Sequence, residues 1–312
     1  MEGETIINIG GIAMEQVFLT GVEIKKVRHL KDISIPLDKE KRKHLILTGK
    51  NGSGKTSFLE SLVQFFLYIT SEGYYSKETV NNKYKEDAVK LDSLKKLKDS
   101  DEKFVKINET EKSLKLWKKD FEIWNNSVTA NVNSISFLQN KFKQGDFIFA
   151  YYKDMRKFQV EEYRNIEKIQ FRDKYSITDN PGTKLTKYLV DLKATQAFTK
   201  DNRKSEKIDK WFHKFEDILK MIFDDDALKL NFNDETFQFS ICESGRETFD
   251  FNTMSRGYAA VLDIINDLII RMEAKSGLRA EFDMEGIVLV DEIETHLHLE
   301  LQKKILPILT TL

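Results

Sequence analysis

The sequence predicts an α/β fold, in which helices flank a mixed β-sheet, and three observations support it. A glycine-rich loop at residues 49–56 stands between an apolar run and an amphipathic helix. Near the other end of the chain, four apolar residues at 287–290 precede an acidic pair at 291–292. Between them, a Ser-Arg-Gly triplet at 255–257 opens a long apolar helix. Strand and helix patterns that alternate in this way are typical of α/β proteins.

The glycine-rich loop reads Gly-Lys-Asn-Gly-Ser-Gly-Lys-Thr and fits the phosphate-loop pattern G-x-x-x-x-G-K-[ST]. The run at 44–48 before it predicts a buried strand, and the apolar spacing at 57–68 predicts a largely buried helix. Glycines let backbone N–H groups point at phosphates, and the helix N-terminus reinforces them. Lys55 is expected to reach the β- and γ-phosphates, and the Thr56 hydroxyl to ligate Mg²⁺. The predicted ATP-binding residues are Asn51, Gly52, Ser53, Gly54, Lys55, Thr56 and Ser57.

The segment before the loop predicts a small antiparallel β subdomain beside the nucleotide. Its short apolar segments lie at 17–19, 22–24 and 33–35. Four basic residues stand between the last two segments, namely Lys25, Lys26, Arg28 and His29. They either flank the base or phosphates of the nucleotide or form a solvated basic edge.

Residues 71–143 form a proline-free, charged insertion. Leucines at every third residue, and Trp and Phe at 3-4-3 spacing, predict two amphipathic helices folded as an arm. The arm is either a docking surface for another protein or a solvated face. The predicted domains are therefore 1–70, the N-terminal half of the fold; 71–143, the insertion; and 144–312, the second half.

The second half begins with a buried strand, followed by two helices and three short strands. These elements are predicted at 146–152, 184–200, 205–223, 228–232, 236–241 and 247–251.

The acidic pair that follows the strand at 287–290 resembles a Walker B element. Asp291 is expected to hold Mg²⁺, and Glu292 to act as the catalytic residue that orients or deprotonates the attacking water. The alternative is a core strand with an acidic end.

A long insertion between the phosphate loop and Walker B is typical of ABC-type ATPases, including SMC-like heads. The triplet Ser255-Arg256-Gly257 stands where that family carries its signature motif, which it resembles. The sequence departs from the family at Met254, which replaces Leu, and at Arg256 and Tyr258, which replace Gly and Gln. The resemblance implies that the signature contacts ATP held by another subunit, in a head-to-head dimer. Alone, Ser-x-Gly before a helix is also an ordinary cap.

The residues after Walker B occupy the place of the D-loop, which holds Thr295, His296 and His298. With Glu294 they form either a polar loop at a dimer interface or a metal site. The C-terminal stretches resemble ABC-like P-loop ATPases of prokaryotic phage-defence loci, of the Septu (PtuA-like) and retron-associated types. That resemblance implies ATP hydrolysis with Mg²⁺, a homo-oligomer, and a partner effector such as an HNH nuclease.

ABC-type heads continue beyond Walker B with a strand that bears a switch histidine and lies between the Walker A and Walker B strands. This sequence ends at Leu312, about one helix after Walker B. We therefore expect a fragment of a longer polypeptide; the alternatives are a strand from elsewhere or an altered head. The resemblance predicts ATP binding and makes turnover depend on that strand.

Composition limits the remaining classes of function. The 50 basic and 51 acidic residues balance, so nucleic acid is expected to be contacted only through dimerisation or a partner. The single cysteine, Cys242, excludes an internal disulfide, and no apolar run reaches about 18 residues, so a cytoplasmic protein without a membrane span is expected. The alternative functions are a nucleotide-dependent scaffold or sensor without turnover, a DNA-repair SMC-like head, and a small-molecule kinase.

Overall fold

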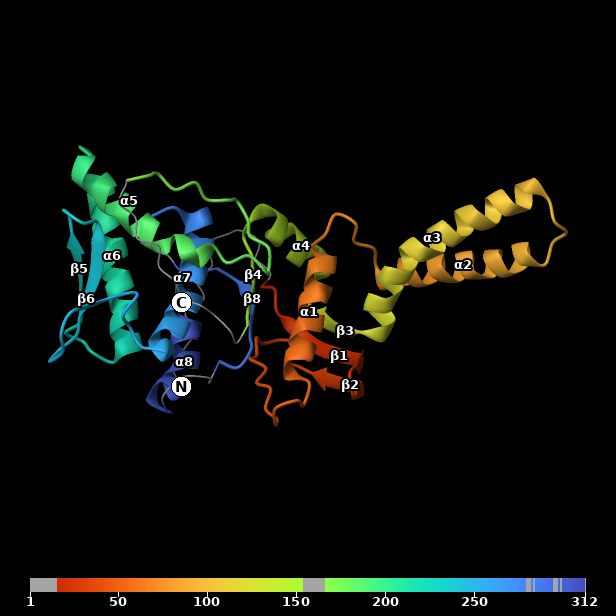
Figure 1. The fold of residues 1–312 in the computed structure, drawn as a ribbon, viewed down its shortest axis with the longest axis horizontal. Helices are drawn as coiled ribbons and strands as arrows, with labels where there is room; N and C mark the ends of the chain where they lie inside the picture. Colours follow the sequence, from red (N-terminus) through yellow and green to blue (C-terminus); the bar gives the residue numbers. More distant parts are fainter. Residues whose placement is uncertain are drawn as a thin grey trace.

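The computed structural model describes residues 16–153, 166–278, 282, 284–293, 297 and 299–311. A body of helices and small sheets carries a helical hairpin that projects from one end (Figure 1). No helix within the described ranges is both long enough and apolar enough to cross a membrane.

Helices and strands alternate along the chain, which confirms the predicted α/β class. In order they are β1 (Leu19–Val27), β2 (Leu30–Pro36), α1 (Lys55–Ile69), α2 (Lys77–Lys95), α3 (Asp101–Asn126), β3 (Val128–Val132), α4 (Ile135–Gln144), β4 (Ile148–Tyr152), η1 (Pro181–Lys184), α5 (Leu185–Phe198), α6 (Asn202–Phe223), β5 (Lys229–Asn233), β6 (Gln238–Cys242), β7 (Phe249–Asp250), α7 (Arg256–Ser276), β8 (Gly286–Val290) and α8 (Leu299–Thr311).

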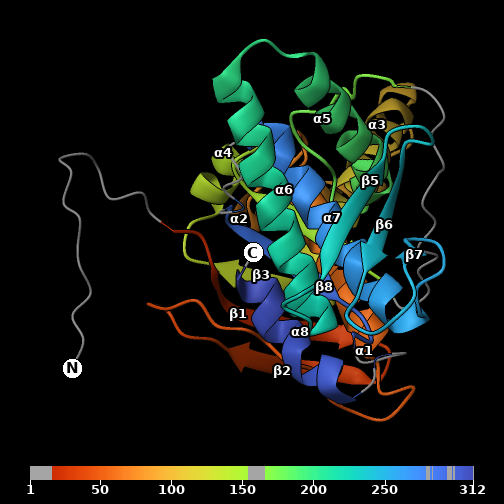
Figure 2. The ribbon, with the colours of Figure 1, turned by 90° about the vertical axis from the view of Figure 1, so that its left-hand side faces the viewer.

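The described strands form three small sheets. Their orders are β2-β1-β3, β4-β8 and β5-β6-β7, and only the β4-β8 pair is parallel. The antiparallel β1-β2 pair agrees with the predicted N-terminal β subdomain, whereas the predicted mixed sheet is represented among the described residues by the β4-β8 pair alone. Because β3 pairs with β1, residues 128–132 return to the body, and the projecting part ends with α3. The β5-β6-β7 sheet covers α6 (Figure 2), where Phe239 stacks on Phe212 with ring centroids 6.0 Å apart.

The strand predicted at residues 44–48 does not form, and this prediction was wrong. The segment is irregular, Ile46 is 65% exposed, and only Leu45 and Leu47 pack against the core. A strand needs a neighbour to satisfy its N–H and C=O groups. Among the described strands, β8 pairs with β4 alone, and none pairs with residues 44–48, so water takes the place of a sheet.

Two hydrophobic cores lie on opposite faces of the β4-β8 pair. Successive side chains of a strand point to opposite faces. Phe149 and Tyr151 accordingly belong to the core that contains α1, whereas Ala150 and Tyr152 belong to the core that contains α7. The helix after the glycine-rich loop and the helix after the Ser-Arg-Gly triplet therefore cover opposite faces of the same two strands.

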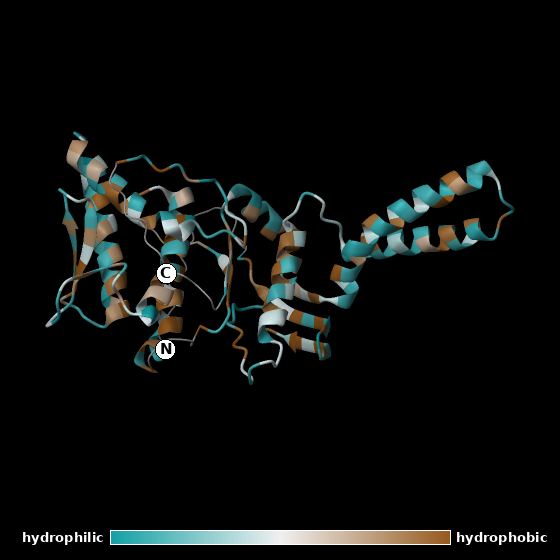
Figure 3. Ribbon diagram, in the orientation of Figure 1, coloured by the Kyte–Doolittle hydropathy of each residue, from teal (hydrophilic) through white to brown (hydrophobic). Residues whose placement is uncertain are grey.

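The insertion forms an antiparallel hairpin of α2 and α3, as predicted. Ser76 and Ser100 cap the N-termini of the two helices. At the base, the Trp124 Nε1–H donates to the Tyr75 carbonyl at 3.2 Å. Hydrophilic and hydrophobic residues alternate along both helices (Figure 3), which agrees with the predicted amphipathic pattern.

Candidate nucleotide-binding site

The backbone of the glycine-rich loop leaves the N-terminus of α1 open to an anion. Gly52 and Gly54 have φ angles of 80° and 95°, and Gly54 is the N-cap of α1. Only glycine adopts this left-handed conformation without strain. No side chain caps the helix, and its first turn carries no acidic residue. The first N–H groups of a helix have no acceptor within it, so they are available to phosphate oxygens.

The Lys55 and Thr56 side chains lie at the loop and on the first turn of α1. The Lys55 Nζ donates to the Gly49 carbonyl at 2.8 Å, so the ammonium already lies over the loop. Thr56 is exposed on the first turn of α1. Asn51 and Gly52 are exposed and Ser53, Lys55 and Ser57 are half-buried, whereas Gly54 is buried.

The turn between β1 and β2 buries Gly54. A Cβ atom at Gly54 would lie 3.2 Å from Leu30 Cδ1 and 3.6 Å from His29 Cε1. His29 therefore lies beside the phosphate loop, which favours the reading that part of the basic segment flanks the nucleotide. Periodicity along one strand gives no signal for this contact, because it joins segments that pack only in three dimensions.

The acidic pair lies at the carboxyl end of β8. Asp291 is 4% exposed, and its N–H donates to the Tyr152 carbonyl at 2.8 Å. In the part of the chain that the structure describes, no side chain or N–H pairs with the Asp291 carboxylate. Glu292 has a φ of 49°, which strains a residue with a Cβ atom by about 1–3 kcal/mol. Such strain is found at functional positions.

Contacts between the halves bring α1 and the carboxyl ends of β4 and β8 together. Ile287 and Leu289 share one core with α1. Directly after β4, the Lys153 Nζ donates to Glu60 Oε1 on α1 at 3.1 Å. Ligands of α/β proteins bind at the carboxyl ends of parallel strands, so this edge is the candidate nucleotide site.

The residues at this edge fit a magnesium ion that a nucleotide brings with it. Mg²⁺ uses one or two protein oxygens together with phosphate oxygens and water. Thr56 offers an exposed hydroxyl, and Asp291 offers a carboxylate that pairs with no side chain among the described residues. The described residues hold no cluster of three His, Cys, Asp or Glu side chains that would bind a metal without a nucleotide.

The signature-like triplet is presented at the surface. Ser255 is the N-cap of α7 but makes no side-chain cap hydrogen bond, and both Ser255 and Arg256 are exposed. Gly257 is buried, and Tyr258 stacks on Phe223 with ring centroids 4.4 Å apart. The structure thus fixes the start of α7 and leaves the Ser255 hydroxyl available.

The helix that begins at the triplet and the helix that follows the phosphate loop pack on opposite faces of β4 and β8. α7 packs in the core on one face of β4 and β8, and α1 packs in the core on the other. The predicted D-loop residues Thr295, His296 and His298 lie outside the described residues.

A buried polar network on α7, which the sequence analysis missed, joins this helix to β4 and η1. Asp267 is fully buried and accepts from Tyr152 Oη at 2.6 Å, Arg271 Nε at 2.6 Å and Gly182 N at 3.2 Å. Burial raises the pKa of the Asp267 carboxyl, and Arg271 opposes the shift. Because the Tyr152 carbonyl accepts from Asp291 N, one residue links α7 to the acidic pair at 291–292. The sequence signal that could have revealed this network is the spacing of Asp263, Asp267 and Arg271, three charged residues four positions apart inside an apolar helix.

A comparison with models of protein families found a match. A family model described as "AAA domain, putative AbiEii toxin, Type IV TA system" matches residues 45–312. The matched range contains the phosphate loop, the triplet at 255–257 and the acidic pair. It confirms a P-loop ATPase-like domain, whereas the resemblance to Septu-type, retron-associated and SMC-like proteins stays a prediction. No curated protein matches the chain.

Proposed function

The chain belongs to the family of AAA domains described as putative AbiEii toxins of type IV toxin–antitoxin systems, and from this premise we propose an ATPase that works as a dimer. In this proposal the chain binds and hydrolyses ATP with Mg²⁺, and two copies associate head to head around the nucleotides. The cycle of association controls a partner effector in anti-phage defence, as the toxin–antitoxin description of the family favours.

One structural observation supports the proposed dimer. α1 and α7 cover opposite faces of β4 and β8, so the phosphate loop and Ser255 start on different sides of the body. In the proposed dimer, the Ser255 hydroxyl and the Arg256 guanidinium reach a nucleotide on a second copy, and the exposure of both residues supports this. In such a dimer each ATP is held between the loop of one copy and the α7 N-terminus of the other.

The chemistry follows from the residues at the edge of β8. The N–H groups at the start of α1 and the Lys55 ammonium hold the β- and γ-phosphates. Thr56 and Asp291 hold Mg²⁺, which offsets charge on the phosphate oxygens when bound. Glu292 orients a water and takes its proton as the water oxygen bonds to the γ-phosphorus. The bond from that phosphorus to the β–γ bridging oxygen breaks, and ADP leaves with the electron pair.

Glu292→Gln tests turnover. Removal of the base is expected to lower the turnover number by about 10²- to 10⁴-fold while ATP binding is kept, because Gln cannot take the proton. The measurements are phosphate release and the ATP-dependent mass of the protein in solution. Dimers should accumulate with ATP in Glu292→Gln, and Glu235→Gln in the β5–β6 turn is the matched control. A monomer at saturating ATP, in both wild type and Glu292→Gln, would refute the dimer.

A second candidate, a scaffold that binds ATP without turnover, is favoured by the irregular segment at 44–48. No described sheet hydrogen bonds join that segment to β8, so the sheet does not fix the phosphate loop against Asp291. ATP-dependent dimers without phosphate release from the wild type would support the scaffold. Plaque counts in cells that carry the native locus, with wild type or Lys55→Ala, test the role in defence.

A further inference from the structure

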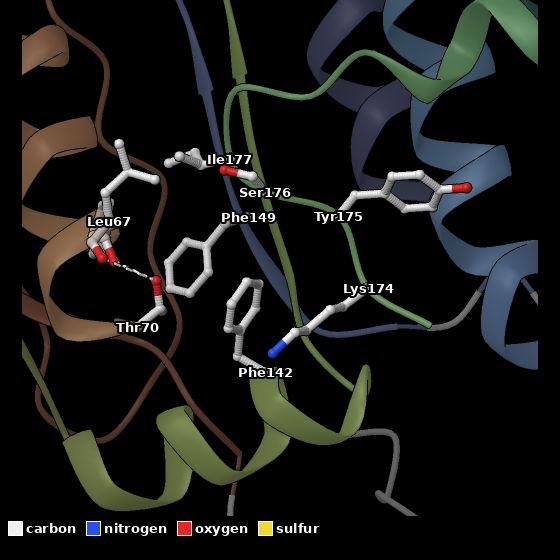
Figure 4. Close-up of a pocket in the computed structure, with 9 residues that line it drawn as sticks. Leu67, Thr70, Phe142, Phe149, Lys174, Tyr175, Ser176 and Ile177 are labelled. Atoms are coloured by element: carbon white, nitrogen blue, oxygen red, sulfur yellow. Dashed lines mark hydrogen bonds between the residues drawn. The ribbon is translucent and has the colours of Figure 1, made fainter. Parts of the chain in front are cut away.

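A cavity of about 250 Å³ lies at the carboxyl end of α1, at the opposite end of this helix from the phosphate loop. It is bounded by α1, α4, β4 and the segment 174–177 (Figure 4). We propose that this cavity binds a small planar aromatic carboxylate, and that Lys174 recognises its acid group. The inference stands independently of the proposed ATPase cycle.

The floor of the cavity is aromatic and dry. Phe66 and Phe149 are each 1% exposed, and their ring centroids are 4.9 Å apart. Phe142 meets Phe149 edge-on at 5.4 Å. These packed rings give the cavity an apolar floor. A cavity of about 150 Å³ accommodates benzene, so this one has room for a fused two-ring compound.

Lys174 gives the cavity its charge. Its ammonium lies 5.7 Å from the centroid of the Phe142 ring and points across the cavity mouth (Figure 4). In the ranges that the structure covers, no carboxylate forms an ion pair with Lys174. A cation beside an aromatic floor attracts both the ring of a guest and an acid group on it.

The opposite wall sets the orientation of the guest. Thr70 Oγ1 donates to the Phe66 carbonyl at 2.8 Å, so the hydroxyl proton is already used. The carboxyl end of α1 is negatively polarised and disfavours an anion. Leu67 and Thr70 lie on one side of the cavity and Lys174 on the other (Figure 4). The ring is therefore expected against the apolar lining near Phe142 and Leu67, with its carboxylate beside Lys174.

The far wall is fixed before any guest arrives. Arg271 on α7 donates to the Phe149 and Ser176 carbonyls, each at 3.1 Å. Its guanidinium also lies 5.8 Å from the centroid of the Tyr175 ring. One buried side chain thus ties β4 to the segment 174–177, and a preformed wall lowers the ordering cost of binding.

Indole-3-acetate and the uncharged indole are the probes, with binding measured by saturation-transfer NMR and calorimetry. Lys174→Met keeps the length of the side chain and removes the charge, and Leu67→Trp fills the cavity from its rim. Lys115→Met on the projecting hairpin is the matched control, because Lys115 is exposed and stands on α3. Thermal melting of each variant checks that the body is folded.

Wild type and Lys115→Met are expected to bind indole-3-acetate more tightly than indole. Lys174→Met should bind the acid about fivefold to tenfold more weakly and leave the affinity for indole within about twofold. Leu67→Trp should lose both probes. The proposal is overturned if wild type binds neither probe, or if Lys174→Met leaves the preference for the acid unchanged. It is also overturned if a folded Leu67→Trp binds as wild type does.

Discussion

α7 and the hairpin of α2 and α3 both contain an acidic and a basic residue four positions apart. The pair on α7 is buried, whereas the pair on the hairpin is exposed to solvent. Glu102 and Lys106 on α3 form an i, i+4 ion pair whose side chains are 87% and 58% exposed. Asp267 and Arg271 on α7 have the same spacing, with side chains 0% and 3% exposed. In water such a pair adds a few tenths of a kcal/mol. In a core, each charge becomes indispensable to the other, because an unpaired buried charge is strongly destabilising.

Arg271→Met is expected to lower the free energy of unfolding more than any other substitution considered below. The change leaves the Asp267 carboxylate buried without its ion-pair partner and frees the Phe149 and Ser176 carbonyls. Removal of one partner of a buried pair lowers the free energy of unfolding by about 3–5 kcal/mol. Urea denaturation measures it. A loss below about 1 kcal/mol would show that the network does not hold α7 to β4.

The loss in Arg271→Met is also expected to depend on pH. Burial raises the pKa of Asp267, and Arg271 opposes this shift. A raised folded-state pKa means that the carboxyl supports folding at low pH and that this support is lost as pH rises through the folded-state pKa. Without Arg271 the shift grows, so the variant should lose more stability relative to wild type at about pH 7.5 than at about pH 5.5. Equal losses would contradict this.

Tyr152→Phe is expected to have the next largest effect. It removes the hydroxyl that donates to Asp267 at 2.6 Å and keeps the ring in the core. Loss of a hydrogen bond to a buried charged acceptor lowers the free energy of unfolding by about 1–3 kcal/mol. Double-mutant cycles with Arg271→Met measure the coupling, which should be clearly non-zero because both residues contact one carboxylate.

Trp124→Phe probes the base of the hairpin and is expected to cost about 1–2 kcal/mol. The variant loses the Nε1 hydrogen bond to the Tyr75 carbonyl and part of the ring contact with Phe65 at 5.3 Å. Thermal melting followed by circular dichroism measures it. Cleavage by trypsin within residues 77–126 should rise in the variant; an unchanged cleavage rate would show that other contacts hold the hairpin.

Glu102→Gln should have the smallest effect. The pair with Lys106 is exposed and screened, so the free energy of unfolding is expected to change by less than about 0.5 kcal/mol. The change should also vanish at about 1 M salt, where screening is strong. If Glu102→Gln lowered the free energy of unfolding as much as Tyr152→Phe does, burial would not explain the difference between the ion pairs of α7 and α3.

The sequence predicted the phosphate loop, the helix after it, the β8 strand with Asp291-Glu292 and the start of α7. Each is encoded by neighbouring residues, whose apolar spacing and glycines act locally. It failed at residues 44–48, because an apolar run forms a strand only where another strand pairs with it, and no described strand does. It also missed Asp267 and Arg271, whose partners lie on β4 and near η1.

By itself, the sequence determined a glycine-rich loop followed by an uncapped helix start, because these glycine conformations follow from a few consecutive residues. Only the tertiary structure decided that α1 and α7 lie on opposite faces of β4 and β8, and that one tyrosine joins α7 to the acidic pair at 291–292. Packing brings together residues that are far apart along the chain, and a buried charge has its effect only once that packing has removed water. The same two charges four residues apart are a solvated pair on α3 and a structural link on α7.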